Sequence, residues 1–346
     1  PENDFKRILK TEAFLPMKKG VSIIICTYNG RARLAHTLSH LATQKSTCPV
    51  EIVFVDNNSS DGTKGFADDW WRKNGNPNIE YKSFFQPIPG KSYAQELGYT
   101  KAQYEYLLIC DDDNWLCETY VQNAFEQMKK KPKIGALGGW CEAVFENKKP
   151  EWFDTYAKYF AVSKQGKESG DITNKKGCLF GAGMVIRKSH WLQLNALGFT
   201  PLLTCRKGDT LSSGGDTEYC YALRLLGYKI WYDKRLYFKH WMPKGRMKLS
   251  YIQRLRKAMS ESNFIVSVYV DELKNREVTQ KTFYKRAFRS LKNDFLKQSK
   301  KRLKGSFEEK EISKEYFRGL YRLITQYREY SKNRNSIKTW LPQNNT

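Results

Sequence analysis

Residues 21–30 read VSIIICTYNG, an apolar run that is followed at once by a polar turn. An unbroken apolar run of this length predicts a strand that is buried on both faces. The next stretch, RARLAHTLSHLATQ (31–44), is amphipathic, and the spacing of Leu34, Leu38 and Leu41 places them on one face of a helix. Strand, polar turn and helix together form the unit from which parallel sheets are built.

The same unit recurs through the first third of the chain. Further strands are predicted at EIVFV (51–55), IEYKSFF (79–85) and EYLLIC (105–110), with helices at residues 62–73 and 91–102 between them. This alternation predicts an α/β protein with a mostly parallel, Rossmann-like sheet that is covered by helices on both faces. Ligands of such sheets bind outside the carboxyl ends of the strands. The clusters TYNG, DNNSSDG and DDDN all follow strands, so we predict one binding site there.

Charge is distributed unevenly along the 346 residues. The net charge is +24, and residues 241–346 hold 26 Lys+Arg against 10 Asp+Glu, so this last part carries +16. A basic tail favours a polyanionic partner, either an anionic membrane or nucleic acid. The eight cysteines form no CxxC pair, and no stretch approaches the ~20 apolar residues that span a bilayer. We therefore expect a reduced, cytoplasmic protein.

The stretch LLICDDDNWL (107–116) ends a predicted buried strand on three adjacent carboxylates, Asp111, Asp112 and Asp113. Neighbouring carboxylates repel, and each raises the pKa of the next unless a cation lies between them. Hard divalent cations bind carboxylate oxygens, so the stretch is a candidate metal site. The alternative is a cluster that caps the next helix, although one aspartate would be enough for that role.

Three other segments offer polar groups that have both a structural and a functional interpretation. VDNNSSDGT (55–63) contains Asp56 and Asn57, which suit contacts with a nucleobase or a ribose but are equally common in plain turns. GGDTE (214–218) places acidic residues at a helix start, where capping alone explains them. His240 closes a predicted strand, and a single histidine is more often structural than a ligand.

In order and spacing, residues 20–243 resemble glycosyltransferase family 2, the inverting, nucleotide-sugar-dependent enzymes of GT-A fold. VSIIICTYNG resembles the opening strand and nucleotide-binding turn of this family, VDNNSSDGT its base-contacting loop, CDDDN its DxD region and GGDTE its catalytic-base segment. The resemblance implies a lead-in at residues 1–20 and a GT-A catalytic domain at residues 21–245. In that domain, 21–115 would be the nucleotide-binding half and 116–245 the acceptor half. A basic helical C-terminal region (246–346) would follow.

The resemblance also implies roles for individual residues. Asp216 would be the general base, and a divalent cation, Mn²⁺ or Mg²⁺, would bridge the DxD aspartates and the donor diphosphate. The metal ligands would be Asp111, Asp113 and His240. The nucleotide-binding residues would be Thr27, Tyr28, Asn29, Asp56, Asn57, Lys91, Asp111 and Asp112, and the residues beside the sugar or the acceptor would be Trp140, Gly181, Ala182, Gly183, Gly215 and Glu218.

The chain departs from the family pattern at several positions. Asn57 stands where a second Asp is common, residues 95–96 are Gln-Glu in place of an Arg-Asn pair, and Gly215 replaces the usual Glu before the base. Processive members carry QxxRW, whereas residues 253–257 here read QRLRK. The missing motif favours transfer of one sugar, or of a few, over synthesis of a long polymer.

These observations predict the partners of the protein. The donor would be a nucleoside-diphosphate sugar, with a UDP-sugar favoured, and the acceptor a glycan, lipid-linked, in cell-envelope polysaccharide biosynthesis. Basic and aromatic residues alternate at helical spacing in the C-terminal region, which suits binding to an anionic membrane at its inner face. The alternative is a helical cap packed on the catalytic domain. A nucleotidyltransferase and a non-catalytic, basic nucleic-acid-binding protein are the competing functions, and nucleic acid is the less favoured partner because no recognised motif is present.

Overall fold

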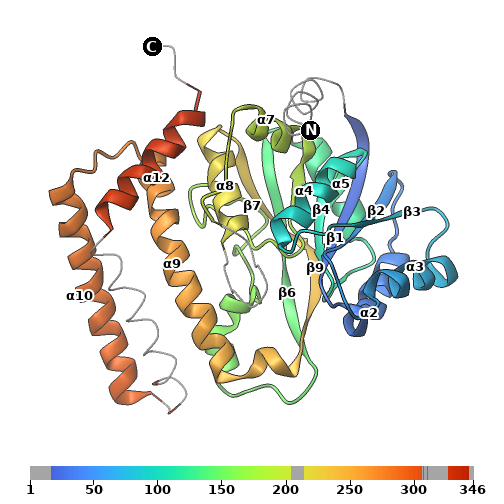
Figure 1. Ribbon diagram of the computed structural model, residues 1–346, viewed down its shortest axis with the longest axis horizontal. Helices are drawn as coiled ribbons and strands as arrows, with labels where there is room; N and C mark the ends of the chain where they lie inside the picture. The colour runs from blue at the N-terminus through green and yellow to red at the C-terminus, as the bar shows by residue number, and fades with distance from the viewer. Residues whose placement is uncertain (1–16, 204–213, 306, 308–309, 311–325, 343–346) are drawn as a thin grey trace.

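The computed structural model describes residues 17–203, 214–305, 307, 310 and 326–342 (Figure 1). In these residues a nine-stranded sheet has the strand order β3-β2-β1-β4-β8-β6-β9-β5, and β7 pairs with β9. The strands are β1 (Lys18–Thr27), β2 (Val50–Asp56), β3 (Glu80–Phe85), β4 (Tyr104–Asp111), β5 (Asn114–Leu116), β6 (Ile134–Phe145), β7 (Gly170–Asp171), β8 (Val185–Arg187) and β9 (Lys229–Met242). The helices are α2 (Arg31–Ala42), α3 (Thr63–Asn74), α4 (Lys91–Lys101), α5 (Tyr120–Lys130), α6 (Phe153–Tyr156), α7 (Lys188–Ala196), α8 (Gly215–Leu225), α9 (Leu249–Leu273), α10 (Gln280–Lys304) and α12 (Tyr327–Trp340), with 3₁₀ turns η1 (Ala157–Phe160) and η2 (Lys244–Met247).

Half of the sheet is parallel, as the alternation of strands and helices predicts. β1 pairs in parallel with β2 and β4, and β2 pairs in parallel with β3. The other half is mixed, because β8 runs antiparallel to β4 and β6 whereas β9 runs parallel to β6. The segment 178–189 contributes only Val185–Arg187 to the sheet. His240, predicted to close a strand, lies within one long strand, β9.

Strand β1 shows why the sheet is covered on both sides. Ile23 and Ile25 pack into the core that includes Leu34 of α2. Ile24, between them in sequence, packs into the opposite core with Ala94 of α4. Successive side chains of a strand point to opposite faces, so an unbroken apolar run fits a strand between two helical layers. The predicted burial of this strand on both faces is confirmed.

In its described residues, the basic C-terminal region is helical from Leu249, as predicted, and α9, α10 and α12 lie beside the sheet on the side of α8 (Figure 1). Phe264 and Tyr269 of α9 and Trp340 of α12 belong to the same core as the helices on that face. The helices therefore pack on the α/β body, while the division of the chain at residue 245 stays a prediction. No helix in the described part of the chain combines the length and apolar character needed to cross a bilayer.

A single carboxylate joins α9, α10 and α12. Asp271 of α9 is buried, and its two oxygens lie 2.7 Å from Nη1 and Nη2 of Arg286 on α10. The Tyr330 hydroxyl of α12 donates to Asp271 Oδ2 at 2.7 Å. Burial alone raises the pKa of Asp271, but the hydrogen bonds from Arg286 and Tyr330 outweigh it and lower that pKa below its usual range.

We predict that Asp271→Ala lowers the free energy of unfolding by about 1–3 kcal/mol, because it leaves buried donors unsatisfied. Urea denaturation at pH 7 measures this difference. A lowered folded-state pKa makes the ionised carboxylate stabilising above the ordinary value of 3.8, and this contribution is lost as the pH falls through the folded value. The gap between the two proteins should therefore close in strong acid. Asp69→Ala, which removes an exposed partner of Arg72, is the control and should change stability by under about 0.5 kcal/mol; equal effects of the two substitutions contradict the prediction.

Candidate active site

The carboxyl ends of β1, β2 and β4 lie side by side. Thr27 is in register with Asp56, and Cys26 is in register with Asp111. The polar segments that follow these strands therefore meet at one edge of the sheet. This is the convergence that the sequence predicts from parallel strand order.

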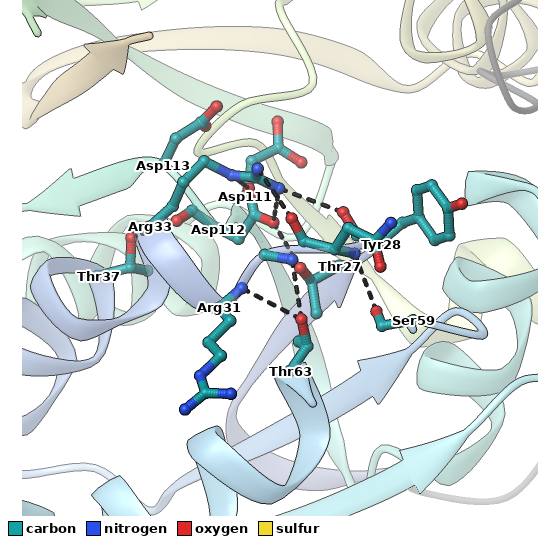
Figure 2. A network of polar contacts seen from close by, with 12 residues as sticks. Thr27, Tyr28, Arg31, Arg33, Thr37, Ser59, Thr63, Asp111, Asp112 and Asp113 are labelled. Atoms are coloured by element: carbon teal, nitrogen blue, oxygen red, sulfur yellow. Dashed lines mark hydrogen bonds and ion pairs between the residues drawn. The ribbon is translucent and has the colours of Figure 1, made fainter. Parts of the chain in front are cut away.

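Asp112 is held by side chains of β1 and α2 (Figure 2). Arg33 contacts both carboxylate oxygens, with Nη2 2.6 Å from Oδ2 and Nε 3.1 Å from Oδ1. The Thr27 hydroxyl donates to Oδ2, and the Thr37 hydroxyl donates to the main-chain oxygen at 2.9 Å. Burial raises the pKa of Asp112, and the Arg33 guanidinium opposes that shift. The carboxylate is thus fully engaged by the protein.

Arg33 also fixes the turn after β1. Its guanidinium donates to the main-chain oxygens of Asn29 at 3.1 Å and Tyr28 at 3.3 Å. Asn29 adopts a left-handed conformation with φ 47°, and its backbone N–H donates to the Ser59 hydroxyl at 2.9 Å. The turn is therefore joined to the loop after β2, while the Tyr28 ring projects into solvent (Figure 2).

Asp56 and Asn57, the two predicted nucleotide contacts at the end of β2, have different hydrogen-bond partners. Asp56 is buried, and its Oδ1 has no hydrogen-bond partner among the described residues. Asn57 donates to the Ile88 oxygen at 2.7 Å and accepts from the Gly90 N–H at 2.7 Å. Its amide therefore holds the loop that leads to Lys91, at the start of α4. Asp56, with an unpaired buried oxygen, is the better placed of the two for a ligand.

Asp111 and Asp113 each face a cation of their own. Lys91 Nζ lies 2.5 Å from Asp111 Oδ1, and both side chains are half-buried. Asp113 is buried, with Arg246 Nη1 2.9 Å from Oδ2 and His240 Nε2 3.3 Å from Oδ1. Burial alone raises the pKa of Asp113, but the charges of Arg246 and His240 outweigh it and hold that pKa well below its usual range.

The pairing of β5 with part of β9 brings Asp113 and His240 together. β5 and β9 are antiparallel, with Asn114 opposite His240, and the Trp241 N–H donates to the Asp113 oxygen at 2.9 Å. His240 is buried, and its Nδ1 has no hydrogen-bond partner among the described residues. A buried carboxylate beside an imidazole nitrogen offers two ligands that suit Mn²⁺.

Across the described residues, no three His, Cys, Asp or Glu side chains are grouped so that they alone would hold a metal ion. Mg²⁺-type sites commonly use one or two carboxylates, with substrate phosphates and waters completing the shell. The Asp113–His240 pair fits that pattern, with Asp111 on the preceding strand end. The donor set therefore fits a divalent cation that arrives with a phosphate-bearing ligand.

Asp216, the predicted base, lies in the first turn of α8. Its Oδ2 accepts from the Gly181 N–H at 2.6 Å and its Oδ1 from the Thr217 N–H at 2.9 Å. The predicted glycine segment is thus in direct contact with the predicted base. Gly183 has φ +70°, and a Cβ there would lie 2.5 Å from the Tyr120 hydroxyl, so the segment requires glycine. Ala182, between the two glycines, is buried.

The other predicted acceptor residues are Glu218, Trp140 and Gly215, and they do not contact the glycine segment in the same way as Asp216. Glu218 is fully buried and accepts hydrogen bonds from the backbone N–H groups of residues 202 and 203 and from the Tyr269 hydroxyl. These bonds occupy the Glu218 carboxylate, so Glu218 stabilises the first turn of α8, which also carries Asp216. The Trp140 indole N–H donates to the Lys234 oxygen at 3.0 Å, and its ring centroid lies 4.8 Å from that of Tyr237. Gly215 is the first residue of α8.

Two arginines of the site were not predicted. Arg33 follows the TYNG turn by one helical turn, so its sequence position already places it near the strand ends. Arg246 has no comparable signal, because it reaches Asp113 only once β9 has paired with β5 and η2 has turned the chain back. Each of the three adjacent aspartates therefore has a basic partner from a different element.

Most strands of the sheet that carries this site lie in a segment that matches a known protein family. The sequence model of the family described as Glycosyl transferase family 2 matches residues 22–191. Residues 22–191, just under half of the chain, therefore form a glycosyltransferase family 2 segment. Poly-beta-1,6-N-acetyl-D-glucosamine synthase of Staphylococcus epidermidis is 27% identical over 139 residues, which are 40% of this chain and 32% of that protein. The chain thus aligns with only about a third of the length of this relative.

Solved structures place the fold. The chain is similar to the mannosyltransferase PcManGT from Pyrobaculum calidifontis in complex with GDP-Man and Mn²⁺, with a TM-score of 0.54, 16% identity, and coverage of 98% of this chain and 92% of that one. It is also similar to Staphylococcus aureus TarS 1-349 in complex with UDP-GlcNAc, with a TM-score of 0.51, 14% identity, and coverage of 93% and 89%. The predicted GT-A fold is confirmed.

We predict that Gly30→Ala destabilises the site. A Cβ at residue 30 would overlap the Thr27 hydroxyl and lie 2.6 Å from Asp112 Oδ2, so the contact between these residues must open. Overpacking of this kind costs about 1–3 kcal/mol, measurable by thermal unfolding. Gly65→Ala is the matched control, because a Cβ there meets nothing within 4 Å in a helix, and it should stabilise by about 0.5–1 kcal/mol. If both variants unfold at the wild-type temperature or above, the tight contact is disproved.

Proposed function

We propose that this chain is a metal-dependent, inverting glycosyltransferase that moves a sugar from a nucleoside-diphosphate sugar to a glycan acceptor. The observation that carries the proposal is the Asp113–His240 pair beside the end of β4, together with the Asp216 carboxylate at the start of α8, in a chain of GT-A fold. A metal ligand set and a carboxylate base are the two kinds of group that this reaction requires.

The donor is proposed to be a UDP-sugar, and the acceptor a lipid-linked glycan of a cell-envelope polysaccharide. The Staphylococcus epidermidis relative is a polysaccharide synthase, and the TarS structure was solved with UDP-GlcNAc, which favours this choice. The PcManGT structure holds GDP-Man, so guanine nucleotides belong in the same screen. Within the chain, Asp56 Oδ1 is the acceptor best placed for a base or ribose, and Lys91 is the cation best placed for a phosphate.

The residues that would hold the cation are Asp113 and His240, with Asp111 beside them. When bound there, a divalent cation acts as a Lewis acid that stabilises the charge on the leaving diphosphate. Asp113 suits this role because its pKa is held low, which keeps it ionised over the whole physiological range. Asp112 is engaged by Arg33 and Thr27, so its proposed part is to hold the turn after β1 around the nucleotide.

Asp216 is proposed to accept the proton of the acceptor hydroxyl. The hydroxyl oxygen attacks the anomeric carbon from the face opposite the diphosphate, so one displacement inverts the centre. Two backbone N–H groups, from Gly181 and Thr217, fix the direction of the carboxylate. Because the Gly181 N–H bond at 2.6 Å ties the base to the glycine segment, that segment and the base form one positioned unit.

We predict that Asp216→Asn retains nucleotide binding and loses transfer. Loss of a general base typically costs 10²–10⁴-fold in rate, so we expect about that decrease in transfer from the matching donor. Calorimetry with UDP, GDP, dTDP and CDP, with Mn²⁺ or with EDTA, measures binding and identifies the donor class. Asp113→Ala is the contrasting variant and should lose metal-dependent binding. No nucleotide binding by the folded wild-type protein would overturn the proposed function, and full activity of Asp216→Asn would overturn the role of this residue.

The outer face of α10 is the proposed membrane contact. Lys281, Lys285, Arg289 and Lys292 are exposed, and Phe288 and Leu296 are 69% and 53% exposed among them. At 100° per residue, these six residues lie within one stripe of about 100° of the helix surface. Phe283, on the opposite side, is buried against the α9–α12 core. α10 lies at the outer edge of the molecule, with α9 between it and the sheet (Figure 1).

An exposed stripe of basic and large apolar side chains fits the interface of an anionic bilayer, which attracts lysine and arginine and accepts apolar rings. We therefore propose that the protein is peripheral on the inner membrane face, where a lipid-linked acceptor would be anchored. The packing of α9 and α12 on the body is compatible with this role, because it leaves the α10 stripe uncovered by the described residues.

We predict that the full-length protein sediments with phosphatidylglycerol vesicles and not with phosphatidylcholine vesicles. Replacement of Lys285, Arg289 and Lys292 by Glu should weaken this binding by at least about tenfold, because each basic residue contributes about 1 kcal/mol at an anionic surface. The control replaces three exposed lysines of another surface, Lys129, Lys130 and Lys133, by Glu. Equal loss in both triple variants would show a net-charge effect and contradict the assignment to α10.

A further inference from the structure

Arg246 lies where the proposed metal ligands meet. It belongs to η2, a 3₁₀ helix of one turn that begins two residues after the end of β9. Its Nη1 is 2.9 Å from Asp113 Oδ2 and 3.4 Å from His240 Nε2. The guanidinium thus contacts both groups of the pair at once.

Arg246 compensates the negative charge of Asp113, from which it lies 2.9 Å away. Asp113 is buried with only 1% of its surface exposed, and an uncompensated buried carboxylate is costly. Arg246 therefore supplies a large part of the charge that allows Asp113 to be ionised in the interior.

We infer that Arg246 is the resident counter-cation of the Asp113–His240 pair, and that a divalent cation must displace its guanidinium to bind there. The inference rests on the proposed function, because it concerns the same metal ligands. Oxygen and nitrogen ligands approach such metals to about 2.0–2.2 Å. A guanidinium nitrogen that lies 2.9 Å from the same carboxylate competes for that space and repels the incoming charge.

The backbone around Arg246 is anchored, so the side chain is the part that moves. The Arg246 N–H donates to the Pro243 oxygen at 2.9 Å, and the Lys244 N–H donates to Glu146 Oε2 at 2.7 Å. Rotation of a long side chain from a fixed turn requires no rearrangement of β9 or α9. Arg246 is therefore a positioning residue that sets the affinity of the site for its metal.

The test measures Mn²⁺ binding to the full-length protein, first without nucleotide and then with UDP or GDP, by the electron paramagnetic resonance signal of free Mn²⁺. We expect Arg246→Gln to lower the Kd for Mn²⁺ by about tenfold or more, because it removes a competing charge at close range. Arg246→Lys retains the charge and should remain within about threefold of the wild type. Arg235→Gln is the matched control and should leave the Kd unchanged. Arg235 pairs with Asp233 on β9, away from Asp111, Asp112 and Asp113.

Arg246→Met, which keeps the aliphatic bulk without the charge, repeats the measurement if the Gln variant fails to fold, as judged by thermal unfolding. Unchanged or weaker Mn²⁺ binding in the folded neutral variants overturns the inference and leaves the proposed function standing, provided that Asp113→Ala abolishes binding. A Lys variant as tight as the Gln variant also overturns it, since charge would then not be the competitor. Absence of Mn²⁺ binding in every protein, with and without UDP or GDP, overturns both the inference and the proposed metal dependence.

Discussion

Mutual repulsion among three adjacent carboxylates is the constraint on which the rest of the site depends. Asp111, Asp112 and Asp113 stand at the end of a buried strand, and each is compensated from a different part of the chain. Lys91 opens α4, Arg33 lies one turn into α2, and Arg246 follows β9. The starts of two helices and the end of the longest strand are therefore tied to one short acidic stretch. A fold that satisfies these pairs has already brought the ends of β4 and β9 and the starts of α2 and α4 together.

Helix α9 contacts the start of α8, which carries the proposed base, and also covers a face of the sheet. Tyr269 of α9 donates to Glu218, and Glu218 in turn accepts from the backbone at residues 202 and 203. Glu218 lies two residues after Asp216 in the first turn of α8. Helix α9 of the basic region is thus bonded to the same helical turn that carries the proposed base. Through Asp271 the same helix is joined to α10 and α12, so that one set of contacts links the proposed membrane face to the proposed base.

The sequence was sufficient wherever a local pattern determines the structure. The apolar run of β1, the polar turns after parallel strands and the helix that begins at Leu249 each follow from short-range periodicity. Periodicity does not identify which distant strand pairs with which, so the mixed half of the sheet and the single long β9 were not predicted. Residue type gives hydrogen-bonding capacity but not the partner. Asn57 and Glu218 looked like ligand-binding groups, and their amide and carboxylate are instead used by the protein itself.

Under the proposed reaction, the cations that compensate the aspartates also lie where negative charge grows. Cleavage of the bond between the sugar and the diphosphate leaves a nucleotide with more negative charge than the donor carried. Interactions that strengthen as this charge develops favour the transition state over the bound donor. Lys91 and Arg246 are positive groups held beside the aspartates by ion pairs of 2.5 and 2.9 Å, and a guanidinium released from Asp113 needs a new anionic partner. The acidic stretch would then have two roles. It binds a metal, and it holds basic side chains in ion pairs until they can pair with the diphosphate instead.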